Sequence, residues 1–282
     1  MNFKKAEKIA FVFFMFAFLP VLSFCENSFC AGLIENFFQL RMELSKFDSE
    51  SESEIQKIIS SIDSFIETNQ ELLNSLSPQE QLVMENFFVM EKYNYLYEKP
   101  EQKKNQQEIL GRQLKKIESY VQKNSTDDLH EYFLVTWGDV TSCYMGFSLS
   151  DVIKYGTTVR PHYEKALEKN PNLSYGLTNL GQWYYFAPKI TGGSKKKSLQ
   201  LFQKAKQNSV SPAENYFADI FLSQLLFENK EYGQCNELLE DAEKICDGSW
   251  YLKRIRDAND QGLSLFEYNR KKSSLNEEAE KK

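Results

Sequence analysis

The chain has 282 residues, of which 41% are hydrophobic and 14% aromatic, and this composition excludes a generally disordered polypeptide. Its formal net charge of −6 argues against a general nucleic-acid-binding protein, which would need a basic surface. It contains only 12 glycines, which favours helices because glycine is unfavourable inside them. Since no segment alternates like a β-strand, we predict an all-α fold.

Residues 1–25 have the pattern of a secretory signal peptide, with a basic start and a nearly unbroken apolar run over 9–24. That run is short for a membrane-spanning helix, which needs about 20 residues. Small residues at positions 23 and 25 place the expected cleavage after Cys25, so we expect an exported protein of the periplasm or cell envelope. Two alternatives stay open: lipid attachment at Cys25 or Cys30, and an uncleaved membrane anchor. The basic residues are Lys4, Lys5 and Lys8.

An N-terminal helical region is predicted over residues 26–124. A first helix is expected in "AGLIENFFQLRMEL", and isoleucines spaced by three and four residues mark a second over 55–66. The stretch Ser77-Pro78-Gln79-Glu80 is a helix start, because serine can cap, proline fits the first turn and glutamate can reach back. That helix should end near Tyr97, and a further helix should cover 101–123.

Spaced large and small residues recur from residue 125 onward. "YFLVTWGDVTSCY" precedes "HYEKALEKNP", "LTNLGQWY" precedes "SLQLFQKA", and Ser211-Pro212 begins "FLSQLLFENKEYGQCNELLEDA" after a few residues. In each case a Gly or Ser lies in the first helix of the expected pair. The second helix then carries an aromatic residue or a leucine, followed three residues later by an alanine. Small residues at such positions let paired helices approach closely.

These positions resemble those of tetratricopeptide repeats, in which two antiparallel helices form each unit. The resemblance implies an array of about three units over 125–249, with insertions between the helices of the first two. A closing helix is expected over 250–268, and residues 269–282 read as a charged, solvated tail. The stretch "FAPKITGG" also resembles a feature of exported helical-repeat proteins, among them the tetratricopeptide lipoproteins associated with TRAP transporters.

The Gly192-Gly193 pair raises the question of a phosphate-binding loop. A phosphate loop follows a strand and carries G-x-x-x-x-G-K, whereas here an aromatic helix precedes and that motif is absent. We therefore interpret the stretch as a turn between two helices, with a serine capping the second. A weaker alternative is an anion held at this helix start. Its contacts would be Ser194, Lys195 and Lys196.

No catalytic constellation is found. His130 and His162 are not in a metal-binding spacing, no cysteine pair has zinc spacing, and no G-x-S-x-G occurs. Cys143 falls on a predicted packing helix, so a structural role is favoured over a nucleophile. The five cysteines are too scattered for a disulfide framework. We expect no enzyme activity, no metal and no cofactor.

The resemblance implies a concave groove lined by the first helices of successive units. Aromatic and amide side chains there fit recognition of a protein or peptide partner, so an interaction scaffold of the envelope is our first hypothesis. The alternative is an accessory that binds a small hydrophobic solute or a transporter's solute-binding component. It also stays open that neighbouring helices cover these side chains as core. The expected contact residues are Tyr175, Thr178, Gln182, Tyr185, Phe217, Ile220, Gln224 and Phe227.

Overall fold

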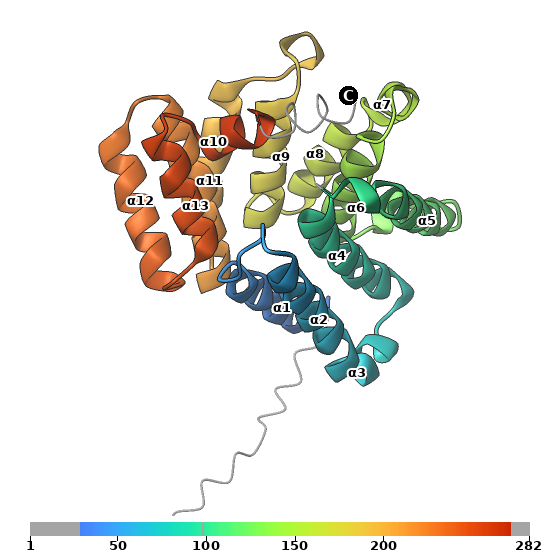
Figure 1. Ribbon diagram of the computed structural model, residues 1–282. Helices are drawn as coiled ribbons and strands as arrows, with labels where there is room; N and C mark the ends of the chain where they lie inside the picture. The colour runs from blue at the N-terminus through green and yellow to red at the C-terminus, as the bar shows by residue number, and fades with distance from the viewer. Residues whose placement is uncertain (1–28, 98, 272–282) are drawn as a thin grey trace, which may run out of the picture.

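The computed structural model describes residues 29–97 and 99–271, and within these ranges the protein is all-α, as predicted (Figure 1). The signal peptide over 1–25, with Cys25, and the end of the charged tail lie outside the described residues. No described helix is long and apolar enough to cross a membrane. The helices are α1 (Ala31–Leu44), α2 (Glu52–Thr68), α3 (Gln70–Ser75), α4 (Pro78–Leu96), α5 (Lys103–Val121), α6 (Glu131–Met145), α7 (Leu149–Tyr155), α8 (Val159–Lys169), α9 (Ser174–Phe186), α10 (Lys195–Asn208), α11 (Pro212–Glu228), α12 (Tyr232–Ile245) and α13 (Trp250–Asp260), with short 3-10 turns η1 (Pro100–Gln102), η2 (Thr126–Asp128) and η3 (Lys189–Thr191).

Several helices begin at the residues that the sequence indicated. Ser77 and Glu80 form a reciprocal capping box at the start of α4. Ser194 and Ser211 each accept a hydrogen bond from the backbone N–H three residues on, which fixes the starts of α10 and α11. Pro161 lies in the first turn of α8, where proline is tolerated.

Two helix boundaries differ from expectation. The first helix of the repeat region was expected from about residue 125, but Ser125 caps only the turn η2, and α6 starts later, with the Nδ1 atom of His130 accepting from the Tyr132 N–H. The closing helix expected over 250–268 is interrupted after α13, because Gly262 adopts a φ of 76°. There the Leu263 N–H bonds to the Ala258 carbonyl, a helix-ending arrangement that favours glycine. A separate C-terminal helical segment then covers 265–271.

Small residues bring helices close together in the second half. A Cβ atom added at Gly138 of α6 would lie 2.5 Å from the Tyr163 ring of α8, and one at Gly181 of α9 would lie 2.5 Å from the Phe202 ring of α10. Gly181 directly follows Leu180 in α9. In α11 the fully buried Ser223 follows Leu222 in the same way. Each of these contacts permits an approach that a larger residue would block.

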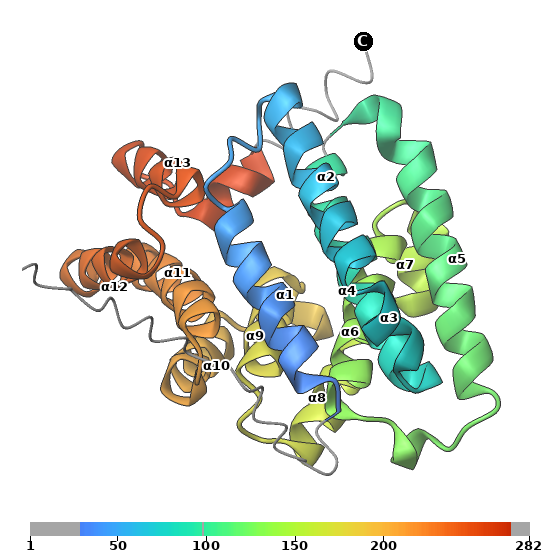
Figure 2. The same cartoon turned by 90° about the horizontal axis from the view of Figure 1, so that it is seen from below.

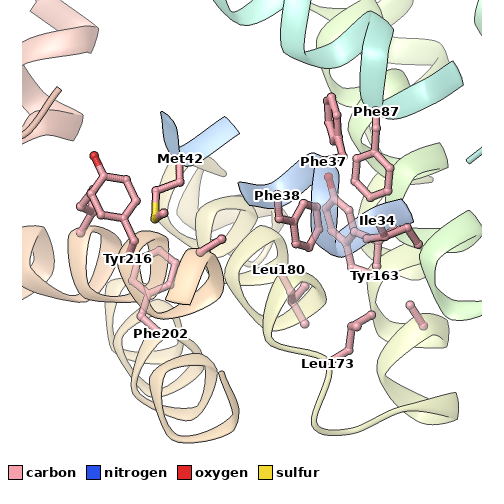
Figure 3. Close-up of a cluster of buried hydrophobic side chains, with 14 of the residues drawn as sticks. Ile34, Phe37, Phe38, Met42, Phe87, Tyr163, Leu173, Leu180, Phe202 and Tyr216 are labelled. Carbon is pink, nitrogen blue, oxygen red and sulfur yellow. The ribbon is translucent and has the colours of Figure 1, made fainter. Parts of the chain in front are cut away.

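The helix α1 lies across the inner side of these helices, between α4 on one side and α11 on the other (Figure 2). In Figure 3 its residue Phe37 lies beside Phe87 of α4, with ring centroids 5.8 Å apart, and Met42 lies on the side of Tyr216 of α11. Burial of such side chains stabilises by about 1.5–3 kcal/mol each. Therefore α1 belongs to the main hydrophobic core and joins the two halves of the molecule.

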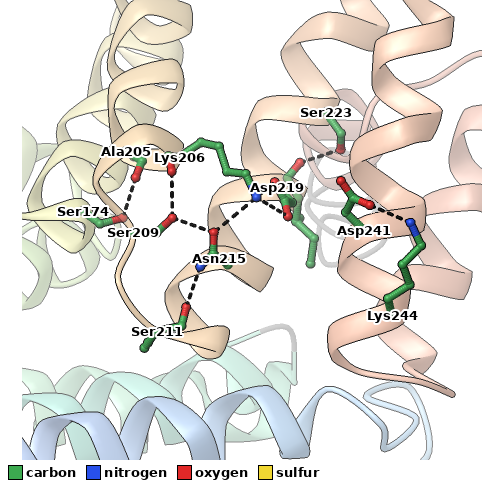
Figure 4. Close-up of polar contacts among 11 residues, drawn as sticks. Ser174, Ala205, Lys206, Ser209, Ser211, Asn215, Asp219, Ser223, Asp241 and Lys244 are labelled. Atoms are coloured by element: carbon green, nitrogen blue, oxygen red, sulfur yellow. Dashed lines mark hydrogen bonds and ion pairs between the residues drawn. The ribbon is translucent and has the colours of Figure 1, made fainter.

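Polar contacts fix the corner where α9, α10 and α11 meet (Figure 4). The Ser174 hydroxyl donates to the Ala205 carbonyl at 3.0 Å, and the Lys206 ammonium lies 2.7 Å from the fully buried carboxylate of Asp219. Burial raises the pKa of Asp219, while Lys206 opposes that shift. A buried carboxylate needs such a partner, so this ion pair holds α10 against α11.

Candidate ligand-binding site

The side chains expected to line a concave groove are covered by α1 at one end of that surface. The Tyr175 ring lies 5.2 Å from the Phe38 ring, and the Arg41 guanidinium lies 5.0 Å from the Phe217 ring. Thr178 and Ile220 are buried. Tyr175 and Phe217 therefore form an interface with α1 in place of the expected open groove.

The C-terminal helical segment covers the other end of the same surface. The ring of Tyr185 lies 4.5 Å from that of Phe266, and the Gln224 side chain accepts a hydrogen bond from the Leu265 N–H at 2.8 Å. The two remaining residues are half-buried and bond or pack locally: Gln182 donates to Asn179, and Phe227 packs on Tyr232. Covering by neighbouring helices, which the sequence left open, is the arrangement found.

A buried polar cluster lies where α1 meets this surface. The Arg41 Nε atom lies 2.7 Å from the Glu91 carboxylate. The hydroxyls of Tyr175 and Tyr163 donate to Asp139 at 2.6 and 2.8 Å. Burial raises the pKa of Asp139 to about 6, and the two tyrosine hydrogen bonds and nearby Arg41 oppose that rise. Every charged group here has a partner inside the protein, so the cluster joins helices and leaves no vacant ligand position.

The loop with the candidate anion contacts is a structured turn. Gly192 has a φ of 102°, and a Cβ atom at Gly193 would lie 1.8 Å from the Ala187 carbonyl, so both positions require glycine. Ser194 caps α10, and the Lys195 ammonium lies 2.6 Å from Glu228. Lys196 is exposed. Two of the three expected contacts thus have protein partners.

The two histidines and Cys143 pack against other side chains of the fold. His130 stacks on Phe29 at 3.6 Å between centroids, and His162 stacks on Trp137 at 3.8 Å. Burial lowers the pKa of His162 to about 4, so it is neutral at physiological pH. Within the described residues no hydrogen bond joins Cys143 to either histidine. Burial raises the pKa of the Cys143 thiol. No group of three metal-ligating side chains occurs within residues 29–97 and 99–271.

A pocket of about 530 Å³ lies between α2–α3, α4 and α5 in the N-terminal region. Its apolar lining comes from all of these elements, whereas its amides and charges come mainly from α4 and α5. This size is typical of pockets that hold small molecules. The apolar residues are Ile66, Leu73, Met84, Phe88, Val89, Leu96 and Ile109; the polar residues are Gln70, Asn74, Gln81, Glu85, Lys92, Asn105, Gln106, Gln113 and Lys116.

One wall of the pocket is held by a chain of hydrogen bonds that runs from the core to the rim. Asn86 donates to Thr136 at 3.0 Å, and Gln113 donates to Asn86 at 2.8 Å. At the rim, Glu85 accepts from Lys116 at 2.8 Å. Because the inner amides are buried and satisfied, this wall is pre-organised and not free to collapse into the pocket.

The opposite rim carries Lys92, which is ion-paired with Asp63 of α2. Both rim lysines therefore belong to partly exposed ion pairs, which contribute little stability and open readily. With Asp63 counted, the rim carries two lysines and two carboxylates, so it is neutral while both ion pairs are closed. The pocket thus combines an apolar floor with two rim lysines that a ligand carboxylate can reach when an ion pair opens.

A second hollow, of about 650 Å³, lies beside Phe47 and the outer face of α2. Its lining is otherwise serines, one glutamine and one lysine, so it offers little apolar surface to a ligand. We therefore regard the pocket between α2–α3, α4 and α5 as the better candidate site. Sequence reasoning missed it, because its lining residues lie on the margins of four helices and form no motif.

No protein-family model matches this chain, and no curated protein matches its sequence at a significant level. The resemblance to tetratricopeptide repeats thus rests on the spacing of residues such as Gly138, Gly181 and Ser223.

Proposed function

We propose that this is an exported, non-catalytic binding protein with a tetratricopeptide-like second half, and that it binds an amphiphile in the pocket between α2–α3, α4 and α5. The ligand would have an apolar body and one anionic end, as a fatty acid has. The single observation that carries the proposal is the pocket itself: an apolar floor of ligand size with two lysines at its rim.

The packing in the second half supports the repeat-like part of this proposal. Gly138, Gly181 and Ser223 occupy matching places in α6, α9 and α11, and fully buried alanines lie on each partner helix. Those alanines are Ala166, Ala205 and Ala242. In this view the second half is a rigid frame, while the ligand lies in the N-terminal region.

Binding of a dansyl-labelled fatty acid, with displacement by unlabelled fatty acids, tests the proposal. Val89→Trp and Ile109→Trp each place a large ring in the pocket and should weaken binding by about tenfold or more, since the ligand would lose apolar contacts. Val210→Trp is the matched control, because Val210 is 89% exposed on the connection between α10 and α11. Equal binding by all variants would contradict the site.

Native mass spectrometry of the protein from its own cells gives an independent readout. An amphiphile that co-purifies with the parent chain and is absent from Ile109→Trp would identify the ligand class. If no small molecule co-purifies and no fatty acid binds, the amphiphile proposal fails.

A second candidate function is capture of a protein helix on the concave surface. One observation favours it: α1, a single apolar helix, already occupies that surface and contacts Tyr175 and Phe217 through Phe38 and Arg41. A partner helix would have to replace α1. Covalent locking of α1, described in the Discussion, distinguishes this candidate from the pocket.

A further inference from the structure

Two connections between paired helices lie at the same end of the molecule. The helix α7 connects α6 to α8, and η3 connects α9 to α10; both are at the upper edge of Figure 1. Arg160, in the first turn of α8, reaches from one to the other: its guanidinium lies 5.3 Å from the Trp183 ring and beside Gly192. We call this end, formed by residues 149–155 and 186–197, the loop edge.

Large apolar side chains protrude from the loop edge. Ile190 is 94% exposed, Leu149 is 76% exposed and Ile153 is 75% exposed. Val152 and Phe186 are also exposed. These are separate protruding side chains on two connections, which differs from the continuous flat patch that a protein interface of about 800 Å² per partner requires. Protruding apolar side chains of this kind suit insertion between lipid head groups.

The charge of this region is opposite to that of the whole chain. The chain has a net charge of −6, yet residues 169–213 contain seven lysines and no aspartate or glutamate. At the loop edge, Lys189 and Lys196 are exposed, and neither has a carboxylate partner among the described residues. Lys154 is exposed beside Ile153. Asp151 and Glu118 lie near Lys154 and offset its charge, so the uncompensated positive charge beside the protruding side chains is that of Lys189 and Lys196.

We propose that the loop edge docks on a membrane surface that contains anionic phospholipid. The side chains of Leu149, Ile153 and Ile190 enter the head-group layer, while lysines beside them contact lipid phosphates. Apolar insertion and electrostatic attraction together give reversible peripheral binding. This binding is separate from the ligand pocket, whose lining residues lie on α2–α5.

Local fluorescence tests the docking without interference from any other membrane-binding segment of the full chain. Ile190→Trp and Ile153→Trp report the two apolar protrusions, and Val210→Trp reports an equally exposed site at the other end of α10. With phosphatidylethanolamine–phosphatidylglycerol vesicles whose acyl chains are brominated, we expect added tryptophan fluorescence to be quenched at 190 and 153 but not at 210.

Charge variants provide the second arm. Lys189→Ala and Lys196→Ala should each weaken vesicle binding, as measured by the quenching, by about fivefold. A lysine near an anionic surface contributes about that factor in affinity. Lys115→Ala, an exposed lysine on α5, should have no effect. Absence of quenching at both 190 and 153, equal quenching at 210, or the same binding to phosphatidylcholine vesicles would overturn the proposal. A photocrosslinker at 190 that captures a protein and no lipid would also overturn it.

Discussion

The Ser45 hydroxyl lies 3.6 Å from the Cys246 sulfur, although 201 residues separate the two in sequence. Ser45 follows α1, and Cys246 follows α12. The Tyr216 hydroxyl, 2.8 Å from the Ser45 oxygen, lies in the same cluster. This contact ties the first described helix to the C-terminal half, and it offers a way to hold α1 in place.

Ser45→Cys is expected to form a disulfide with Cys246 under oxidising conditions, because the two side-chain atoms already lie within bridging reach. Closing so long a loop should stabilise the fold by about 2–5 kcal/mol against urea. Mass spectrometry reports the bond, and urea unfolding with and without reductant reports the stability. The control is Ser45→Cys with Cys246→Ser, which cannot form the bond and should show no reductant-dependent change.

The same variant separates the two candidate functions. A locked α1 leaves the pocket between α2–α3, α4 and α5 accessible, so amphiphile binding should persist in the oxidised protein. Helix capture on the concave surface should instead disappear on oxidation and return on reduction. If amphiphile binding also disappears on oxidation, the pocket is not where the ligand binds.

Asp139→Asn is expected to change how stability depends on pH. In the fold, burial raises the pKa of Asp139 from 3.8 to about 6, so the folded protein binds this proton more tightly than the unfolded chain. Stability from this group therefore falls as pH rises from about 4 to about 6, by about 3 kcal/mol. Asparagine can still accept from one of the two tyrosines through its Oδ1 atom, and its NH2 group can donate to the hydroxyl oxygen of the other. The variant should be more stable than the parent at pH 7, as measured by urea unfolding; a less stable variant there would contradict the sign.

His162→Gln is expected to have the opposite effect. Burial lowers the pKa of His162 from 6.5 to about 4, so the unfolded chain binds this proton more tightly than the fold. Stability from this group rises as pH increases from about 4 to about 6.5, again by about 3 kcal/mol. Because the two groups oppose each other, the parent should show a shallow profile. The Gln variant should lose stability as pH rises through this window. A difference in unfolding free energy between variant and parent that does not change with pH would contradict this prediction.

Gly181→Ala should destabilise the fold by about 1–3 kcal/mol, because the new Cβ atom would lie 2.5 Å from the buried Phe202 ring. Gly233→Ala in α12 is the matched control, since nothing lies within 4 Å of its Cβ position. It should stabilise by about 0.5–1 kcal/mol through helix propensity. Thermal unfolding of both variants checks the pair; equal effects would mean that α9 and α10 do not approach as described.

Much of the helical framework follows from local sequence signals. Ser77, Ser194 and Ser211 cap the helices that they were expected to cap, since a cap depends only on the next few residues. The His130 cap was missed, because an imidazole nitrogen is an uncommon capping acceptor and Ser125 offered a stronger signal nearby.

The candidate site was harder to predict. Tyr175 and Phe217 were assigned to an open groove because their own helices show the pattern of one, yet nothing in those helices encodes that α1 covers them. The pocket depends on the spacing between α5 and α2–α3, which is set by tertiary packing. No short stretch of sequence around Leu73 or Ile109 carries that information.

The position of α1 constrains the order in which the molecule can fold. Its end bonds to Tyr251 through the Ser45 carbonyl at 3.0 Å, so its docking site is complete only after residues beyond 246 have been synthesised. Such long-range contacts slow folding, because a large loop must close before they form. The side of α1 that packs on α4 can be buried early, but its side toward α11 must wait unburied while most of the chain emerges, which favours a late, cooperative collapse and makes C-terminal truncations prone to aggregate.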